Sequence, residues 1–172
     1  MNSEAHQSRA EETFEKRHFL LLQMPCGKFG RDLQASLRAS GHRCTRVAIN
    51  GGDLMGSLWQ RSIAYTRSFA DWPSWVTELA HAETVTDVIC YGDCRPYHRA
   101  AILALKPLGI RIHVLEEGYL RPNWVTCEPD GVNGFSALTS VDLDRVPQQP
   151  AAAAEQKLHA SNLRYCLAGF SY

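Results

Sequence analysis

The sequence predicts one α/β domain built around a mostly parallel β-sheet. Short apolar runs alternate along the chain with segments in which apolar residues recur at helical spacing. When strands and helices alternate in this way, right-handed crossover connections leave neighbouring strands parallel to one another. The length of 172 residues fits a single domain with one hydrophobic core.

The first half of the chain predicts two strands with a helix between them. Residues 18–23 (HFLLLQ) form an apolar run that ends just before a Pro and a Gly, as a buried strand does. Residues 29–39 carry an apolar side chain at every fourth position, which is typical of a helix that covers a sheet. Residues 43–49 form the second strand, and the turn-forming residues 50–53 (NGGD) form its loop.

The second half predicts two more strands and two more helices. One helix is expected after Pro73, because the apolar residues that follow share one helical face. Residues 86–91 (TDVICY) form the third strand, residues 97–108 a helix and residues 110–115 (IRIHVL) the fourth strand. Residues 116–136 are rich in Gly, Pro and Asn and are expected to form a long loop of functional importance.

The two ends of the chain differ in composition from its middle. Residues 1–17 are polar and are expected to form an N-terminal tail, while the domain itself spans residues 18–146. Residues 147–172 begin with a low-complexity stretch and are expected to form a linker and a C-terminal segment.

Charge and hydropathy exclude several classes of protein. The 18 basic residues are balanced by 18 acidic ones, whereas a sequence-independent nucleic-acid binder needs a basic excess. No apolar run approaches the roughly 20 residues that span a bilayer, and no apolar leader follows the N-terminal charges. We therefore expect a cytoplasmic chain without a transmembrane segment. The 6 cysteines form no CxxC pair, so neither a disulfide framework nor a metal site is expected.

Polar residues follow each of the four predicted strands. The carboxyl ends of parallel strands meet at one edge of a sheet, and such sheets bind ligands there, where the strand order reverses. The sequence therefore predicts a cleft for a polar ligand. The candidate residues are, in chain order, Gln23, Asn50, Asp53, Asp93, Arg95, His98, Glu116, Glu117 and Arg121.

Glu116 and Glu117 are adjacent at the end of a strand, so their side chains are expected to point to opposite faces of the sheet. At most one of them then reaches into the cleft, and Gly118 permits the sharp turn that presents Glu117 there. The alternative is that one glutamate pairs with Arg121 or Arg95 while the other is solvated.

Three residues near the start of the helix at 97–108 have two interpretations each. Asp93 either lines the cleft or caps the helix. Arg95 offers a planar fork that suits a carboxylate or a phosphate. His98 lies near the positive end of the helix, where its neutral form is favoured; it is either a general base or a hydrogen-bonded surface histidine.

Four strings of residues together resemble a known family. They are LLLQMPCGKF (20–29), NGGD (50–53), YGDCRPYHRAA (91–101) and EEGYLRPNWVT (116–126), and Glu128 and GVNG (131–134) follow them. In this order they resemble the capsule polysaccharide biosynthesis and export proteins of Gram-negative bacteria, a group of β-Kdo transferases related to the lipid-priming capsule protein. The resemblance covers roughly residues 18–138.

The resemblance implies a single Rossmann-like lobe, the N-terminal half of a two-lobed (GT-B-like) retaining glycosyltransferase. It implies CMP-Kdo as the donor substrate, no further cofactor, and a phospholipid-linked acceptor at the cytoplasmic face of the inner membrane, with capsule assembly proteins as possible partners. Glu117 matches the second acid of the family's acidic-acidic-Gly-aromatic motif and is the expected catalytic carboxylate.

The resemblance also suggests roles for the other candidates. Arg95 or Arg121 would keep Glu117 ionised and bind the carboxylate of Kdo, and His98 would transfer a proton with the acceptor hydroxyl. The remaining candidates would bind substrate; these are Gln23, Asn50, Asp53, Asp93 and Glu116.

Family members are longer and carry a second lobe with a His-Pro signature for the CMP part of the donor. The chain is therefore expected to be incomplete, or a truncated relative, and to show weak or no transfer alone. Two other hypotheses stay open: a non-catalytic binding or assembly module of capsule biosynthesis, and a free-standing domain that binds a nucleotide or a sugar phosphate.

Overall fold

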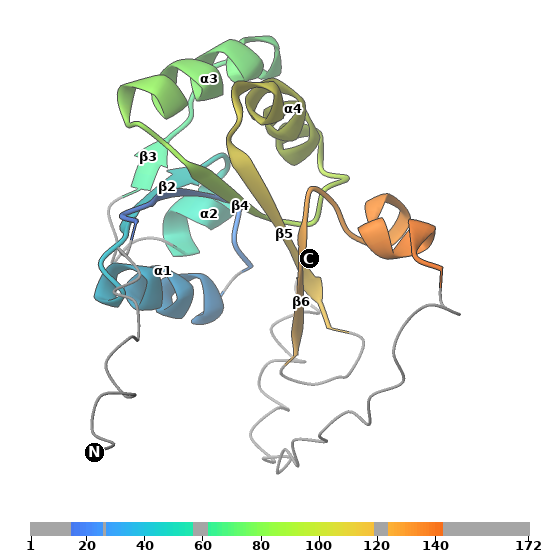
Figure 1. Cartoon of the computed structure of the whole chain (residues 1–172). Helices are drawn as coiled ribbons and strands as arrows, with labels where there is room; N and C mark the ends of the chain where they lie inside the picture. Colours follow the sequence, from blue (N-terminus) through green and yellow to red (C-terminus); the bar gives the residue numbers. More distant parts are fainter. Residues whose placement is uncertain (1–14, 26, 57–61, 119–123, 143–172) are drawn as a thin grey trace, which may run out of the picture.

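The computed structural model describes residues 15–25, 27–56, 62–118 and 124–142 (Figure 1). They form a six-stranded sheet in the order β3-β2-β1-β4-β5-β6. The first five strands run parallel and β6 pairs antiparallel with β5. The strands are β1 (His18–Leu22), β2 (Arg43–Ala48), β3 (Ser62–Ala64), β4 (Asp87–Tyr91), β5 (Arg111–Glu117) and β6 (Val125–Pro129).

Four α-helices and four 3₁₀ turns connect these strands. The α-helices are α1 (Phe29–Ala39), α2 (Gly51–Gly56), α3 (Trp72–Ala82) and α4 (Pro96–Leu105). The 3₁₀ turns are η1 (Phe69–Asp71), η2 (Lys106–Leu108), η3 (Asn133–Phe135) and η4 (Ala137–Ser140). The α/β class and the mostly parallel sheet are therefore as the sequence predicts.

Helices cover both faces of the sheet, with α3 and α4 on one face and α1 on the other (Figure 1). Alternate residues of β1 feed the two cores, since Leu20 and Leu22 pack with Trp72 of α3 while Phe19 and Leu21 pack towards α1. Because β1 contacts helices on both sides, all five of its residues are buried.

Two predictions for individual segments are wrong. Residues 116–136 are not one continuous loop, because β6 lies within them and pairs with β5. Residues 50–53 are not a simple turn, because Gly51 begins the short helix α2. In both cases the strand or helix is only five or six residues long, and β6 is an edge strand that tolerates a proline at its end.

The predicted N-terminal tail and the C-terminal linker fall mostly outside the described residues, and both stay predictions. No helix in the described ranges is long and apolar enough to cross a lipid bilayer. The cysteines that the structure describes are free thiols: Cys44, Cys90, Cys94 and Cys127.

Candidate functional site

The parallel strands have their carboxyl ends side by side, along one edge of the sheet. Leu22, the last residue of β1, lies opposite Val47 of β2 and Cys90 of β4. Tyr91, the last residue of β4, lies opposite Leu115 of β5. The polar segments that follow these strands therefore start at the same edge. Strand order reverses at β1, which lies between β2 and β4, and this reversal marks the usual ligand crevice of an open α/β sheet.

Three of the candidate residues form one hydrogen-bonded cluster at this edge. Asn50 Oδ1 accepts a hydrogen bond from the backbone N–H of Asp53 at 2.9 Å, and Asp53 Oδ2 accepts one from the N–H of Asn50 at 3.2 Å. This reciprocal pair caps the start of α2. Gln23 Nε2 donates to the same Asp53 oxygen at 3.1 Å and so ties the end of β1 to α2.

Gln23 adopts a backbone conformation that residues with a side chain rarely adopt. Its φ angle of 38° lies in the left-handed region, which costs a non-glycine residue of order 1–3 kcal/mol. Gln23 is nevertheless buried, and its side chain is held by Asp53. Strain of this kind concentrates at functional sites, and here it lies at the end of β1, where the strand order reverses.

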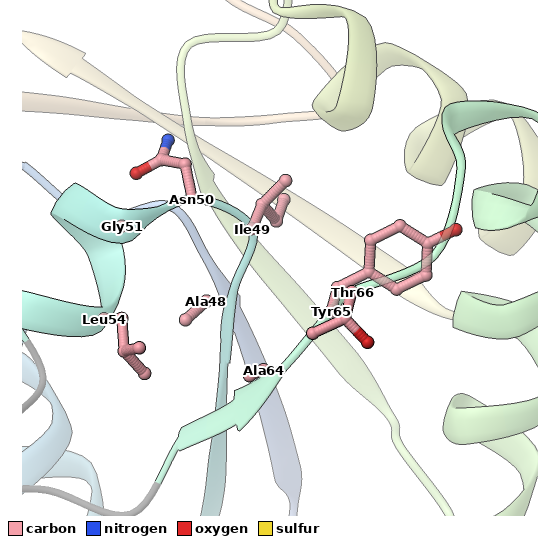
Figure 2. A pocket seen from close by; sticks show the side chains of 8 residues that line it. All are labelled: Ala48, Ile49, Asn50, Gly51, Leu54, Ala64, Tyr65 and Thr66. Atoms are coloured by element: carbon pink, nitrogen blue, oxygen red, sulfur yellow. The ribbon is translucent and has the colours of Figure 1, made fainter.

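A cavity of about 210 Å³ opens beside this cluster (Figure 2). It lies at the carboxyl ends of β2 and β3, and most of its lining is apolar. Because ligand sites for drug-sized molecules measure roughly 300–1,000 Å³, this cavity can hold only part of such a ligand. Its lining residues are Ala48, Ile49, Asn50, Gly51, Leu54, Ala64, Tyr65 and Thr66.

Asp93 fastens the loop after β4 and does not cap α4. Its side chain is buried; Oδ2 accepts a hydrogen bond from the backbone N–H of Val132 at 2.9 Å, and Oδ1 accepts one from Cys94 Sγ at 3.2 Å. The N-cap position of α4 belongs to Arg95, which makes no side-chain capping bond. Asp93 therefore links the end of β4 to the segment after β6.

His98 is fully buried in the first turn of α4, so it is not a surface histidine. Its Nδ1 lies 2.7 Å from the carbonyl oxygen of Gly92. Burial lowers the pKa of His98 to about 4; the Gly92 hydrogen bond opposes this shift, the charge of Arg95 adds to it and that of Asp53 opposes it. The histidine is therefore neutral at physiological pH.

Glu116 and Glu117 end β5 on opposite faces of the sheet, as strand alternation requires. Glu116 has the same parity as Val114, which packs towards α3 and α4, whereas Glu117 has the parity of Leu115, which packs towards α1. Glu116 is half-buried near Gly92, and Glu117 is exposed. Gly118 follows, and a Cβ there would lie only 2.6 Å from the Trp124 Cβ, so only glycine fits.

Of the two arginines among the candidate residues, the structure describes Arg95. Arg95 is exposed at the start of α4, close enough to His98 for its charge to act on the imidazole. Arg121 lies outside the described residues. Among those residues, no three His, Cys, Asp or Glu side chains gather as a metal site would require.

Glu128 is a polar residue of this region that the candidate set omits. It lies on β6 opposite Val114, is 9% exposed, and accepts a hydrogen bond from the Ser136 hydroxyl. Its second carboxylate oxygen, Oε1, is buried without a hydrogen-bond partner. An alternating polar and apolar pattern over 125–129 is the signal that could have identified this strand.

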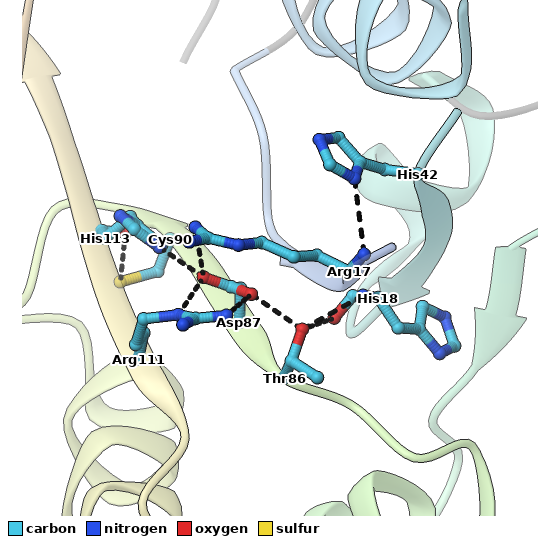
Figure 3. A network of polar contacts seen from close by, with 8 residues as sticks. All are labelled: Arg17, His18, His42, Thr86, Asp87, Cys90, Arg111 and His113. Carbon is cyan, nitrogen blue, oxygen red and sulfur yellow. Dashed lines mark hydrogen bonds and ion pairs between the residues drawn. The ribbon is translucent and has the colours of Figure 1, made fainter. Parts of the chain in front are cut away.

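A buried carboxylate at the opposite edge of the sheet joins neighbouring segments (Figure 3). Asp87, the first residue of β4, is fully buried and accepts hydrogen bonds from Arg111 Nε at 2.8 Å, Arg111 Nη2 at 2.9 Å and Thr86 Oγ1 at 2.6 Å. His113 Nε2 lies 2.8 Å from Asp87, and Arg17 Nη1 lies 3.7 Å away. Burial alone would raise the pKa of Asp87, but the hydrogen bonds hold it well below its usual range.

The neutral His98 predicts a loss of stability in mild acid. Since its pKa falls from 6.5 to about 4 on folding, the unfolded chain binds a proton first as the pH drops. The free energy of unfolding should therefore fall by about 3 kcal/mol between pH 6.5 and pH 4. Chemical denaturation at stepped pH measures this. A His98→Asn variant should lose most of that slope, leaving the smaller contribution of His18, whose pKa burial also lowers; an unchanged slope would contradict the assignment.

Comparisons with known proteins agree with one another. Residues 86–166 match the family model described as "Capsule polysaccharide biosynthesis protein". The chain is 38% identical over 122 residues to the capsule polysaccharide export protein KpsS of Escherichia coli, which covers 71% of this chain and 31% of that protein. It is 32% identical over 123 residues to the capsule polysaccharide modification protein LipB of Neisseria meningitidis serogroup A, which covers 70% of this chain and 29% of that protein.

The chain thus spans about a third of the length of these curated relatives. Among solved structures, a glycosyltransferase from Rickettsia africae superposes with a TM-score of 0.46 at 14% identity, over 63% of this chain and 32% of that one.

Proposed function

We propose that this chain, which resembles capsule polysaccharide biosynthesis proteins, forms the N-terminal lobe of a two-lobed retaining glycosyltransferase that adds Kdo during capsule synthesis. The observation that supports this best is the position of Glu117. It ends a parallel-sheet strand at the ligand-binding edge, is exposed, and points to the opposite face from Glu116.

The proposed reaction is a double displacement at the anomeric carbon of the sugar. A carboxylate oxygen of Glu117 forms a bond to that carbon while the bond to CMP breaks and CMP leaves with the electron pair. The acceptor hydroxyl then attacks the same carbon from the other face, releases the Glu117 carboxylate with its electron pair and loses its proton to solvent water. Two inversions restore the original configuration, which is what retention means.

The other candidates have proposed binding roles. Arg95, and Arg121 beyond the described residues, would bind the carboxylate of Kdo through paired N–H donors. Gln23, Asn50 and Asp53 form the cluster at the end of β1 and would contact sugar hydroxyl groups. Asp93 and Glu116 would complete the site.

The proposed substrates are CMP-Kdo and a phospholipid-linked acceptor. The chain would then work at the cytoplasmic face of the inner membrane as a peripheral protein, beside other capsule assembly proteins. Support for this part comes from the four strings of residues that resemble the family.

A chimera tests the proposal in the setting of a whole capsule protein. The 122 aligned residues of E. coli KpsS are replaced by the matching residues of this chain. We expect the chimera to restore surface capsule to a strain that lacks KpsS, and the purified chimera to transfer Kdo from CMP-Kdo to a phospholipid acceptor. The chain alone, which spans about a third of that protein, should transfer little.

The alternatives give different results in the same assays. A folded chimera that restores capsule but transfers no sugar would indicate a non-catalytic assembly module. Thermal stabilisation of the 172-residue chain by CMP, without transfer by the chimera, would indicate a nucleotide-binding domain, since specific binding raises stability. UDP-sugars, which lack the CMP group, serve as the control donors.

A further inference from the structure

Large apolar side chains are exposed on the segment that follows β6. Phe135, Leu138 and Val141 recur at every third position along η3, η4 and the residue after them, and they are 53%, 62% and 40% exposed. Ser136, between the first two, points inward, because its hydroxyl donates to the buried carboxylate of Glu128. The segment is therefore held to the domain on one side and presents apolar side chains on the other.

One face of α4 lies beside this segment and adds to its apolar surface. The spacing of four and then three residues places Arg99, Leu103 and Lys106 on one side of α4 and its end. The Arg99 guanidinium lies 4.6 Å from the centre of the Phe135 ring, and Lys106 Nζ lies 3.1 Å from the Asp130 carboxylate. Leu103, between these two contacts, is 61% exposed. The α4–η4 patch is the set Leu103, Phe135, Leu138 and Val141.

Four large apolar side chains gathered at one place need an explanation. Single exposed apolar residues are ordinary on a protein surface, whereas a larger apolar patch marks a site that another segment or molecule covers. In the part of the chain that the structure describes, no segment covers the α4–η4 patch, since each of its side chains is at least 40% exposed. The cover must therefore come from outside the described residues.

The chain itself supplies a segment with a matching apolar face. The described residues end at Asp142, directly after the patch, and residues 143–154 can extend over at most about 40 Å. Within residues 155–170, four apolar side chains have the spacing i, i+3, i+4 and i+7, which predicts an amphipathic helix, with Lys157 and Arg164 towards the opposite side. The four apolar side chains are Leu163, Cys166, Leu167 and Phe170.

Two further observations favour this segment over a separate partner. The match to the capsule family model runs without interruption over residues 86–166, so α4, the patch and most of the segment belong to one matched region. The segment is also tethered directly beside the patch. A short tether gives an effective concentration in the millimolar range, so even a small apolar interface can hold the segment in place.

We propose that residues 155–170 form an amphipathic helix whose apolar side packs on the α4–η4 patch. The helix buries Leu138 and Leu103 and covers the outer side of α4, the helix that begins beside Arg95 and carries His98 in its first turn. This docking goes beyond the sugar chemistry proposed above and does not depend on it. It gives the segment after β6 a structural role in supporting α4 at the candidate site.

The thiol of Cys166 reports the docking, because it belongs to the apolar side of the proposed helix. In the 172-residue chain, we expect a maleimide to label Cys166 at least about tenfold more slowly than in the same chain unfolded in urea. Peptide mass spectrometry measures the rate. Leu138→Asp should remove most of this protection, and circular dichroism should show an intact domain, because the side chain is exposed. Met55→Asp, at a 71% exposed position of α2, is the matched control and should keep the protection.

Disulfide cross-linking gives a second readout that depends on position. In the variant Leu138→Cys, mild oxidation should join the new thiol to Cys166 within one chain, since a disulfide forms only when the two Cα atoms come within about 7 Å. The variant Met55→Cys should form no such bond. Peptide mapping after digestion identifies the bonded pair and separates it from bonds of the native exposed thiols Cys94 and Cys127.

Several results would overturn the proposal. One is labelling of Cys166 as fast in the folded chain as in urea. Another is protection that survives both Leu138→Asp and Phe135→Asp, because the segment would then pack somewhere else. Protection that rises with protein concentration would place the segment on a second copy of the chain, and equal cross-linking of Met55→Cys and Leu138→Cys would show no defined position. None of these results depends on sugar transfer, so they leave the test of the proposed function separate.

Discussion

Replacing Glu117 with glutamine in the chimera is expected to lower kcat for Kdo transfer about a thousandfold or more, which corresponds to at least about 4 kcal/mol in the activation free energy. The amide keeps the size and most of the hydrogen bonds of the carboxylate but cannot form the covalent bond to the anomeric carbon. Because Glu117 is exposed at the end of β5, the change should leave the melting temperature nearly unchanged. Loss of turnover without loss of stability is the expected combination.

Initial-rate measurements with CMP-Kdo give kcat and KM for the variant. Glu78→Gln, on the exposed face of α3, is the matched control and should keep full activity. Glu117→Asp should retain only a small part of the wild-type kcat, because the shorter side chain holds its oxygens further from the sugar. Unchanged turnover in Glu117→Gln would remove Glu117 from the reaction, whatever the family resemblance implies.

Replacing Asp87 with alanine is expected to lower the free energy of unfolding by about 3 kcal/mol, or the melting temperature by about 10 °C. The substitution removes the carboxylate that binds Arg111, His113 and Thr86 and leaves their donors without an acceptor. The loss stays below the upper range for buried ion pairs, because the side chain of Arg111 is 43% exposed and can turn to water.

The stabilisation of the fold by Asp87 should also decrease as the pH falls. Its pKa is held below the ordinary value of 3.8, so the ionised carboxylate stabilises the fold above about pH 4, and this contribution is lost as the pH falls below that. Urea unfolding of the wild type and of Asp87→Ala at pH 7 and at pH 3 measures this contribution. The difference between their free energies of unfolding should be smaller at pH 3 than at pH 7. Asp32→Asn, at an exposed ion pair on α1, should shift stability by less than about 0.5 kcal/mol. An equal difference in the free energy of unfolding at both pH values would contradict a stabilising role for the Asp87 charge.

Strongly patterned segments of this fold could be predicted from the sequence. The four strands next to one another in the middle of the sheet are mostly buried, because helices and neighbouring strands cover them on both sides. The sequence does not predict β3 and β6, which are the two outermost strands of the sheet. They are short and half-exposed, so little apolar pattern is required of them.

The site could be predicted as a set of loops but not as a set of contacts. Parallel strand order places the segments after β1, β2, β4 and β5 at one edge, and this follows from alternation alone. The bond from Asp93 to Val132 joins residues 39 positions apart, and it depends on a loop path that no local pattern encodes. The burial of His98 depends likewise on how α4 sits against the sheet, which spacing does not determine.

The buried carboxylate of Asp87 and the exposed carboxylate of Glu117 lie at opposite edges of one sheet. The strand β4 between these edges has five residues, or about 16 Å of extended chain. Substitutions that far apart usually combine additively. A protein engineer could therefore build a heat-tolerant variant from a library confined to the Asp87 edge and then vary sugar selectivity at the other edge, with little need to re-optimise the first set.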